Sequence, residues 1–282
     1  MTERIFNPWN PANKVIPNTV IAQILKKYGN DMKSPDLFRQ ACIHKSYVNR
    51  PEVWQEQKLQ TGESMVIAER PPNCLPLQEA DNEEMEFMGD SVLGCIVAIY
   101  LYQRYPGQGE GFLTRLRTQI VNNKMLGIIA KKLGFGEWIV VSRHVEEICD
   151  GRKNLRILGS MLEAWIGALY VTEDTMSVGS GFRAAQQWFI NVLEEEVDIV
   201  GLIQENTNYK DQLLRHFQAQ YHQTPRYKEV GAEGPPHDRV FTMGVLDIHG
   251  NVLAKSSAKN KKLAEQEASR LALIALTASA AS

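Results

Sequence analysis

The sequence lacks the signatures of several common protein classes. Its 282 residues include only four cysteines, without a C-x-x-C spacing, and two of these lie in apolar helical contexts. That placement is typical of small buried hydrophobic residues rather than of a disulfide framework or a zinc site, and it indicates a reducing compartment. There is also no P-loop, no dinucleotide-binding fingerprint and no G-x-S-x-G elbow.

The sequence also shows no pattern typical of a targeting segment or a membrane-spanning segment. Residues 1–17 carry charges of both signs and three prolines, without the apolar core of a signal peptide. The run VLGCIVAIYLY, residues 92–102, is too short to span a membrane. We therefore expect an intracellular, cytoplasmic protein with no membrane partner.

Charge is distributed unevenly around a formal net value of −2. Residues 207–282 carry 10 Lys and Arg against 7 Asp and Glu, whereas the rest of the chain carries 21 against 26. This asymmetry favours an anion-binding tail and a cation-binding body.

Hydrophobic periodicity divides the chain into two parts. Residues 1–200 have helical apolar spacing almost throughout, which predicts an all-α domain. Within it, residues 51–78 contain several prolines and no clear periodicity, so we predict a long loop or insertion. Residues 207–278 follow the order α-β-β-β-α, with a turn at His249-Gly250-Asn251 between two β-rich runs. The fold class is therefore a multi-domain chain, with an all-α domain followed by an α+β module.

An acidic stripe opens the most apolar helix of the body. In NEEMEFMGD, Glu83, Glu86 and Asp90 are spaced by three and four residues, so a helix turns all three to one side. Carboxylates that gather in a poorly solvated place raise one another's pKa unless a cation is present, and hard oxygen ligands favour Mg²⁺. The pattern predicts a metal site. The alternative for Glu83 is a solvated first-turn residue favoured by the helix dipole.

A second candidate carboxylate lies in RILGSMLEAWIGALYV. Glu163 is the only charged residue between Arg156 and Glu173, and a lone carboxylate in an apolar helix is costly unless it is paired or liganded. Ser160 lies one turn earlier on the same face. The alternative for Glu163 is a salt bridge to an Arg or Lys that faces the core.

A basic cluster marks the start of the last helix. Lys259, Lys261 and Lys262 lie where free backbone N–H groups and the helix dipole already favour anions, which predicts a phosphate contact. The alternative is an ordinary solvated helix start. The polar loop EGPPHDR, residues 233–239, offers His237 as a second contact.

These stretches resemble motifs of the ribonuclease III family. NEEMEFMGDSVLG resembles the family's signature, usually close to N-E-R-L-E-F-L-G-D-S-V-L, and IHKSYVN resembles its T-H-[KR]-S segment. RILGSMLEAWIGALYV resembles the second acidic motif. The tail from about residue 208 to residue 276 resembles a double-stranded-RNA-binding domain. Outside the first thirty residues and residues 51–78, the resemblance covers most of the chain.

The resemblance implies roles for individual acids. Glu86 and Asp90 match the metal-binding pair of the signature, and Glu163 matches the metal-bridging glutamate of the second motif. Glu83 and Glu110 match further acidic positions of the catalytic valley. The implied cofactor is Mg²⁺, with Mn²⁺ as a substitute.

One metal-binding position departs from the family. Where the family has an aspartate, this chain has Ser160. A neutral hydroxyl is a weak Mg²⁺ ligand, so we expect weaker metal binding and slower chemistry. Three explanations remain open: a natural enzyme that uses Ser160 through water, a member kept for RNA binding, or an engineered replacement that traps substrate.

The resemblance implies an endoribonuclease specific for double-stranded RNA. It would act as a homodimer that hydrolyses phosphodiesters in both strands, each subunit cutting one strand. The tail would grip the A-form duplex by its shape and phosphates. The RNA-binding residues expected there are Gln218, Pro235, His237, Lys259, Lys261 and Lys262. The alternative is a catalytically silent protein that sequesters or scaffolds duplex RNA, with Ser160 as its main support.

Overall fold

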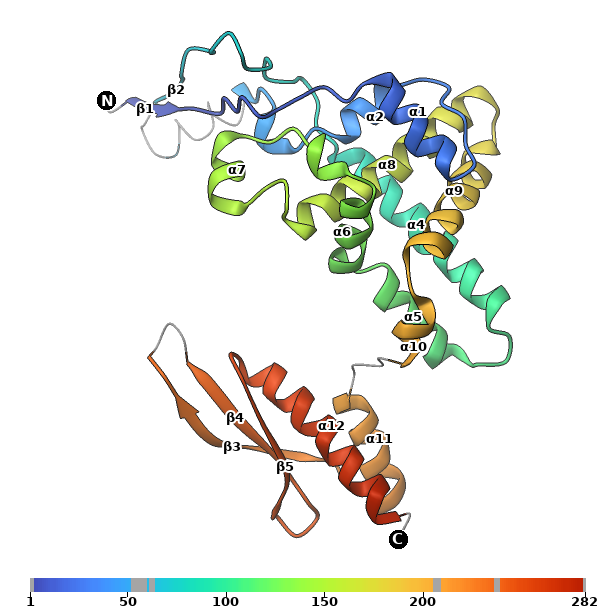
Figure 1. Cartoon of the computed structure of the whole chain (residues 1–282), viewed down its shortest axis with the longest axis vertical. Coiled ribbons are helices and arrows are strands. Elements are labelled where there is room, and N and C mark those ends of the chain that lie inside the picture. The colour runs from blue at the N-terminus through green and yellow to red at the C-terminus, as the bar shows by residue number, and fades with distance from the viewer. Residues whose placement is uncertain (1–2, 52–59, 61–63, 205–208, 236–238, 281–282) are drawn as a thin grey trace. The chain divides into compact units, whose positions relative to one another are not determined.

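The computed structural model describes residues 3–51, 60, 64–204, 209–235 and 239–280. The chain divides into two compact units, Met1–Ile199 and Val200–Ser282 (Figure 1). Helices dominate the first unit: α1 (Asn18–Lys27), α2 (Asp36–Ala41), α4 (Glu83–Arg104), α5 (Glu110–Ile120), α6 (Asn123–Lys132), α7 (Arg143–Cys149), α8 (Leu155–Met176) and α9 (Ser180–Glu196). Two 3-10 turns, Lys45–Tyr47 and Phe135–Glu137, and a short helix α10 (Ile199–Gln204) complete the helical elements described there and at the boundary.

The centre of the first unit is the crossing of α4 and α8. Both helices are 22 residues long and apolar around most of their surface, as expected for buried helices. They meet at glycines: a Cβ added at Gly89 would overlap the carbonyl oxygen of Glu163, and one added at Gly167 would overlap the carbonyl oxygen of Met85. Only glycine allows the two backbones to approach so closely.

Aromatic packing and a side-chain hydrogen bond fix the two helices within the unit. The fully buried Trp165 of α8 lies between Phe38 and Phe135, with ring centroids 4.8 Å away on each side. At the start of α4, the buried Asn82 donates from Nδ2 to the carbonyl oxygen of Ala41, 3.1 Å away. The first turn of α4 is therefore held against the end of α2.

The helix α4 is long and apolar enough, by length and composition, to cross a membrane. The expectation from residues 92–102 missed this because it considered the apolar run without the rest of the helix. Core helices of folded proteins meet the same criterion, and α4 buries eight of its residues, including Leu93, Ile96 and Val97, which are fully buried. The packing against α8 is that of a core helix.

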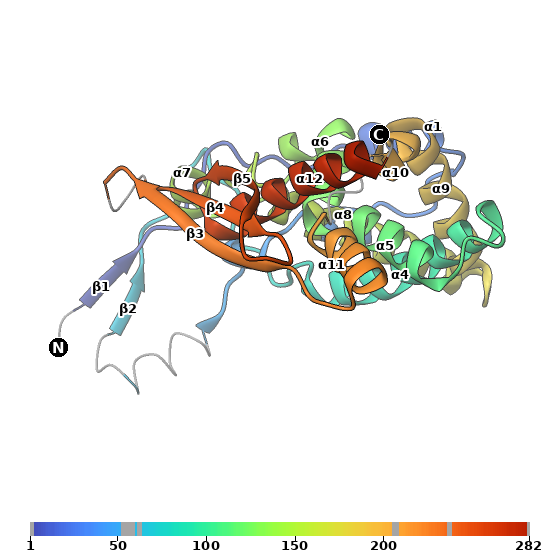
Figure 2. The same cartoon turned by 90° about the horizontal axis from the view of Figure 1, so that it is seen from below.

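A small parallel ribbon accompanies the helices. The strands β1 (Glu3–Phe6) and β2 (Ser64–Ile67) pair along their whole length and lie side by side in Figure 2. Neither strand was predicted, because four-residue strands whose partners lie far apart in the sequence leave no local periodicity. The ribbon adds to the expected all-α unit, and β2 falls within the predicted insertion. Residues 52–59 and 61–63 of that insertion lie outside the described residues.

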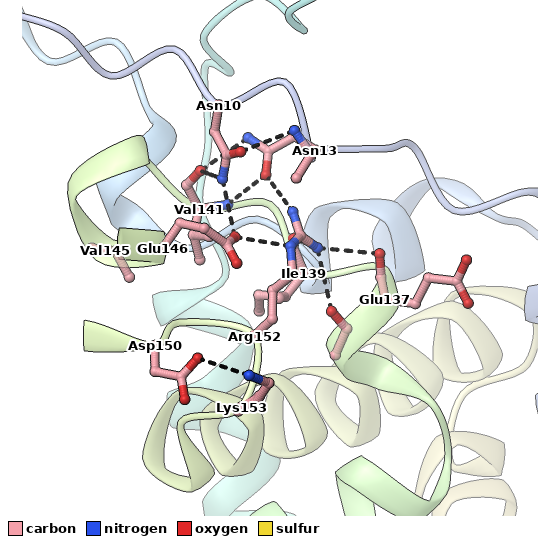
Figure 3. A network of polar contacts seen from close by, with 12 residues as sticks. Asn10, Asn13, Glu137, Ile139, Val141, Val145, Glu146, Asp150, Arg152 and Lys153 are labelled. Carbon is pink, nitrogen blue, oxygen red and sulfur yellow. Dashed lines mark hydrogen bonds and ion pairs between the residues drawn. The ribbon is translucent and has the colours of Figure 1, made fainter. Parts of the chain in front are cut away.

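A polar network ties the N-terminal segment to the turn before α8 (Figure 3). Arg152 donates from Nη1 to the carbonyl oxygen of Ile139 at 2.9 Å and from Nη2 to Asn13 Oδ1 at 2.9 Å, and its Nε lies 2.8 Å from Glu146 Oε2. Asn13 in turn exchanges two hydrogen bonds with the backbone of Val141. The network supplies partners for carbonyl groups that are shielded from water, as buried polar groups require.

The second unit has the predicted order α-β-β-β-α. Its elements are α11 (Tyr209–Tyr221), β3 (Arg226–Glu233), β4 (Val240–Leu246), β5 (Val252–Ala258) and α12 (Lys261–Ala280). The three strands form an antiparallel sheet in the order β3-β4-β5, and both helices pack on it around Leu213, Phe217 and Val245. The turn at His249-Gly250-Asn251 is confirmed, with Gly250 at φ +89°.

The glycine contact between α4 and α8 can be tested by substitution. We expect Gly89→Ala to lower the free energy of unfolding by about 3 kcal/mol, because the added methyl group meets backbone that cannot rotate away. The matched control is Gly94→Ala in the same helix, where an added Cβ meets no heavy atom within 4 Å. That change should leave stability the same or raise it by up to about 1 kcal/mol. Urea unfolding measures both, and equal losses would contradict the close crossing.

Candidate active site

The acidic residues of α4 and α8 meet in one small hollow. It has a volume of about 450 Å³ and is lined by Glu83, Glu86, Phe87, Asp90, Val121, Asn123 and Glu163. Four of these seven residues are carboxylic acids, and the rest come from the signature helix and from the junction of α5 and α6. The hollow is therefore strongly acidic.

The helix crossing explains why acids from two distant segments share this hollow. On α4, Glu83, Glu86 and Asp90 are spaced so that they lie on one face. Gly89, one residue before Asp90, contacts the backbone of Glu163 itself. The close contact of the two backbones brings the Glu163 side chain opposite the α4 acids.

Glu163 is the most perturbed acid of the hollow. It is 5% exposed, and no cation or hydrogen-bond donor pairs with its carboxylate among the described residues. Burial, and to a smaller extent the negative charges of Asp90 and Glu86, raise its pKa from the ordinary value of 4.5 to about 8. The alternative of a salt bridge to a core-facing Arg or Lys finds no partner within the described chain.

Glu83 lies at the edge of the hollow and has partners. Its side chain is 47% exposed, and its Oε1 lies 2.7 Å from Lys45 Nζ while its Oε2 lies 3.7 Å from Arg50 Nη2. Asp81 accepts a hydrogen bond from the backbone N–H of Glu83 and pairs with Arg50. Glu83 is thus half-solvated and neutralised, unlike Glu163.

Two of the expected site residues, Glu110 and Ser160, do not line this hollow. Glu110 begins α5, accepts a hydrogen bond from Thr114 Oγ1 at 2.9 Å, and lines a second, mostly apolar hollow with Tyr102 and Leu113. Ser160 is half-buried one turn before Glu163 and is not among the residues that line the acidic hollow. The serine hydroxyl at this position adds no carboxylate to the set.

The hollow can attract a cation, although the described side chains do not form a complete set of metal ligands. Within the described chain, no group of three or more His, Cys, Asp or Glu side chains is close enough to hold a metal ion directly. Carboxylate oxygens are nevertheless the ligands that Mg²⁺ prefers, and this ion usually keeps several waters and takes only one or two carboxylates. The buried, unpaired Glu163 opposite Glu86 and Asp90 suits such a partly hydrated ion.

The expected RNA-binding residues of the second unit lie on two elements and a loop. Gln218 is exposed on α11 and lines a shallow hollow with His222 and Arg226. At the start of α12, Lys261 Nζ lies 2.6 Å from Glu229 Oε2. This surface ion pair agrees with the alternative of an ordinary solvated helix start. The other exposed members are Lys259, Lys262 and, in the loop after β3, Pro235. His237 lies outside the described residues.

Comparison with known proteins agrees with this architecture. The family model of the ribonuclease III domain matches residues 83–174, and that of the double-stranded RNA binding motif matches residues 209–276. A protein named ribonuclease 3 from Borreliella burgdorferi is 30% identical over 91% of this chain and 91% of its own length. The chain belongs to the ribonuclease III family.

Other relatives of the family differ in length. A probable ribonuclease 3 of Acanthamoeba polyphaga mimivirus is 33% identical over 93% of this chain, but this chain spans only 46% of that protein. The solved nuclease domain of ribonuclease III from Campylobacter jejuni is 27% identical and covers 65% of this chain and 98% of its own, with a TM-score of 0.48.

Sequence reasoning missed the cations and the amide next to the acids. Lys45 and Arg50 precede the signature helix by more than thirty residues, and only the folded chain places them beside Glu83. Lys45 lies in the IHKSYVN stretch, which carries the resemblance to the family but no charge pattern that points to Glu83. Asn123 follows α5 and has no local signal for the hollow.

The raised pKa of Glu163 predicts a pH-dependent stability in the absence of metal. An acid whose pKa is higher in the folded state loses stabilisation as the pH rises from about 4.5 through about 8, because the folded chain must then bury a charge. In EDTA we therefore expect Glu163→Gln to be more stable than the unsubstituted protein at pH 8.5, by about 2 kcal/mol after screening by water in the hollow. At pH 5 the difference should vanish.

Thermal unfolding across this pH range measures the effect. The control is Glu147→Gln, which removes an exposed carboxylate paired with Arg143. A stability difference for Glu163→Gln that stays constant from pH 5 to pH 8.5 would show that this carboxyl titrates normally.

Proposed function

We propose that this chain is an endoribonuclease that hydrolyses double-stranded RNA. The observation that carries the proposal is the buried, unpaired Glu163 facing Glu86 and Asp90 in one hollow. The chain follows this acidic hollow with a unit that matches the double-stranded RNA binding motif. A set of acids without cationic partners, in a chain that also carries a polyanion-binding unit, needs a cation, and phosphodiester hydrolysis uses a bound cation.

Glu86, Asp90 and Glu163 would hold Mg²⁺, with Mn²⁺ as a substitute, since their oxygens suit both ions. The bound ion would supply a water activated for in-line attack and would stabilise the departing 3′ oxygen. Of the three residues, Glu163 gains most from a cation because burial and two negative neighbours disfavour its charge. Glu83 and Asn123 line the same hollow and would face the RNA backbone.

The second unit would bind the duplex by its shape and its phosphates. Gln218 on α11, the loop that contains Pro235 and His237, and the start of α12 with Lys259, Lys261 and Lys262 would make these contacts. The helix start adds backbone N–H groups and a favourable dipole to the lysines. Because Lys261 already pairs with Glu229, Lys262 is the stronger candidate for a new phosphate contact.

We also propose a homodimer in which each subunit cuts one strand. Helix α4 exposes three large apolar side chains, Phe87 at 78%, Tyr102 at 73% and Met88 at 39%. The hollow that contains Glu110 is mostly apolar and is lined by the end of α4 and by α5. Apolar surface of this kind marks interaction sites, and a second copy would bring Glu110 into an assembled valley.

A second candidate function is binding of duplex RNA without cleavage. Ser160 favours it, since the usual aspartate would offset part of the metal charge and a hydroxyl does not. Such a protein would sequester duplex RNA or scaffold a larger RNA particle through the same second unit.

Restoring the aspartate distinguishes the two functions. We expect Ser160→Asp to cleave long duplex RNA about tenfold faster or more at low Mg²⁺ concentration, because the site gains a charged ligand. Gel analysis of the products measures this, with Glu163→Gln in each background as the inactive control. Cleavage by the unsubstituted chain would exclude the binding-only function. Failure of both proteins to cut would count against the endoribonuclease.

The phosphate role of the α12 lysines can be tested by salt titration. We expect Lys262→Ala to weaken duplex binding and to reduce the slope of log affinity against log salt by about one, because one phosphate contact releases about one counterion. Lys255→Ala removes an exposed lysine of β5 and serves as the matched control. An unchanged slope for Lys262→Ala would refute the contact.

A further inference from the structure

Two cations hold the one acid that lies at the edge of the hollow. Each carboxylate oxygen of Glu83 has its own partner: Lys45 Nζ is 2.7 Å from Oε1, and Arg50 Nη2 is 3.7 Å from Oε2. Among the described residues, these are the only cations in an ion pair with a side chain that lines the acidic hollow. The arrangement is a pair of positive groups around a single, two-oxygen anion.

The backbone that carries the two cations is fixed. Lys45 begins a 3-10 turn in which Ser46 donates its N–H to His44 Nδ1, and Ser46 Oγ accepts from the backbone N–H of Ser142 at 2.9 Å. Tyr47 is fully buried and donates its hydroxyl to the carbonyl oxygen of Leu75 at 2.8 Å. The segment that presents the pair is therefore anchored to the rest of the unit by hydrogen bonds.

Arg50 is held from the other side. Asp81 pairs with it and, through its second oxygen, accepts the backbone N–H of Glu83 at 3.0 Å. The backbone of residues 47–49 is also hydrogen-bonded to that of Gln78. Asp81 lies closer to Arg50 than Glu83 does, so Glu83 is the more easily exchanged of its two partners.

The side chains at the contact remain open to water. Lys45 is 54% exposed, Arg50 31% and Glu83 47%, so the ion pairs contribute little to stability and can exchange partners at small cost. A phosphodiester offers what the Glu83 carboxylate offers, namely one negative charge on two oxygens, and it binds Lys and Arg by the same charge-assisted hydrogen bonds.

The acids of the hollow explain why a phosphate would replace Glu83 at Lys45 and Arg50. RNA reaches the site as a polyanion, and the negative charges of Glu86 and Asp90 repel it except where a cation intervenes. Resting on the function proposed above, we infer that Lys45 and Arg50 form a phosphate-binding subsite for the RNA backbone beside the cleavage site. Glu83 occupies this subsite in the RNA-free protein and leaves it when a phosphate binds.

Lys45→Gln is the decisive variant. Among the described residues Lys45 pairs with Glu83, so the substitution removes one proposed phosphate contact and only this ion pair. We expect its affinity for a duplex RNA of about thirty base pairs, measured with the full chain in EDTA, to fall about fivefold and the salt slope to decrease by about one. In Mg²⁺, KM for cleavage should rise with little change in kcat. Thermal unfolding should remain the same, since the pair is exposed.

Lys14→Gln is the matched control. It removes a lysine of similar exposure from an ion pair that is also exposed, 60% for Lys14 and 57% for Glu137. Glu137 does not line the hollow. Equal effects of the two substitutions on affinity and salt slope, or no effect of Lys45→Gln, would overturn the subsite.

Glu83→Gln tests whether this acid stands in for phosphate. Removing its charge frees Lys45 and leaves Arg50 with Asp81 alone, so duplex binding in EDTA should tighten, although cleavage should not improve. Weaker binding by Glu83→Gln would overturn the exchange. The binding measurements need no cleavage, so a failure of the endoribonuclease assay and a failure of the subsite are separate results.

Discussion

The close crossing of α4 and α8 is the constraint on which the site depends. Gly89 and Gly167 let the two backbones touch, and that contact sets Glu163 opposite Glu86 and Asp90. Trp165, packed between Phe38 and Phe135, fixes α8 within the core. The acids are thus positioned by apolar packing and backbone contact rather than by any attraction among themselves, since they repel one another.

The electrostatic design of the hollow follows from that packing. The fold compensates the charge at the edge, where Lys45 and Arg50 reach Glu83, and leaves it uncompensated in the interior at Glu163. An uncompensated buried carboxylate is costly, so its presence points to a ligand rather than to stability. Ser160 adds no carboxylate to this set, and the three acids Glu86, Asp90 and Glu163 all line one hollow.

The two units differ in what they contribute: the first carries the acidic hollow, and the second matches the double-stranded RNA binding motif. The second unit consists of a sheet and two helices that carry basic residues. It has a hydrophobic core of its own, formed by Leu213, Phe217, Val245, Ala268 and Ala272, so its packing does not depend on the acidic hollow. The first unit has a separate core and carries the acids. In the proposed function, the second unit would bind the polyanionic substrate, and Lys45 and Arg50 would bind its backbone at the first unit.

The sequence by itself determined the helices, the α-β-β-β-α module and the acids of the signature stripe, because period and spacing are local properties of a chain. It also indicated Glu163 as an anomaly, through its charge in an apolar helix. Only the tertiary structure decided that Glu163 has no cationic partner within the described chain, that Lys45 and Arg50 pair with Glu83, that Glu110 and Ser160 lie outside the acidic hollow, and that β1 pairs with β2. Each of these depends on segments far apart in the chain, whose meeting is set by how buried helices pack and not by any local pattern.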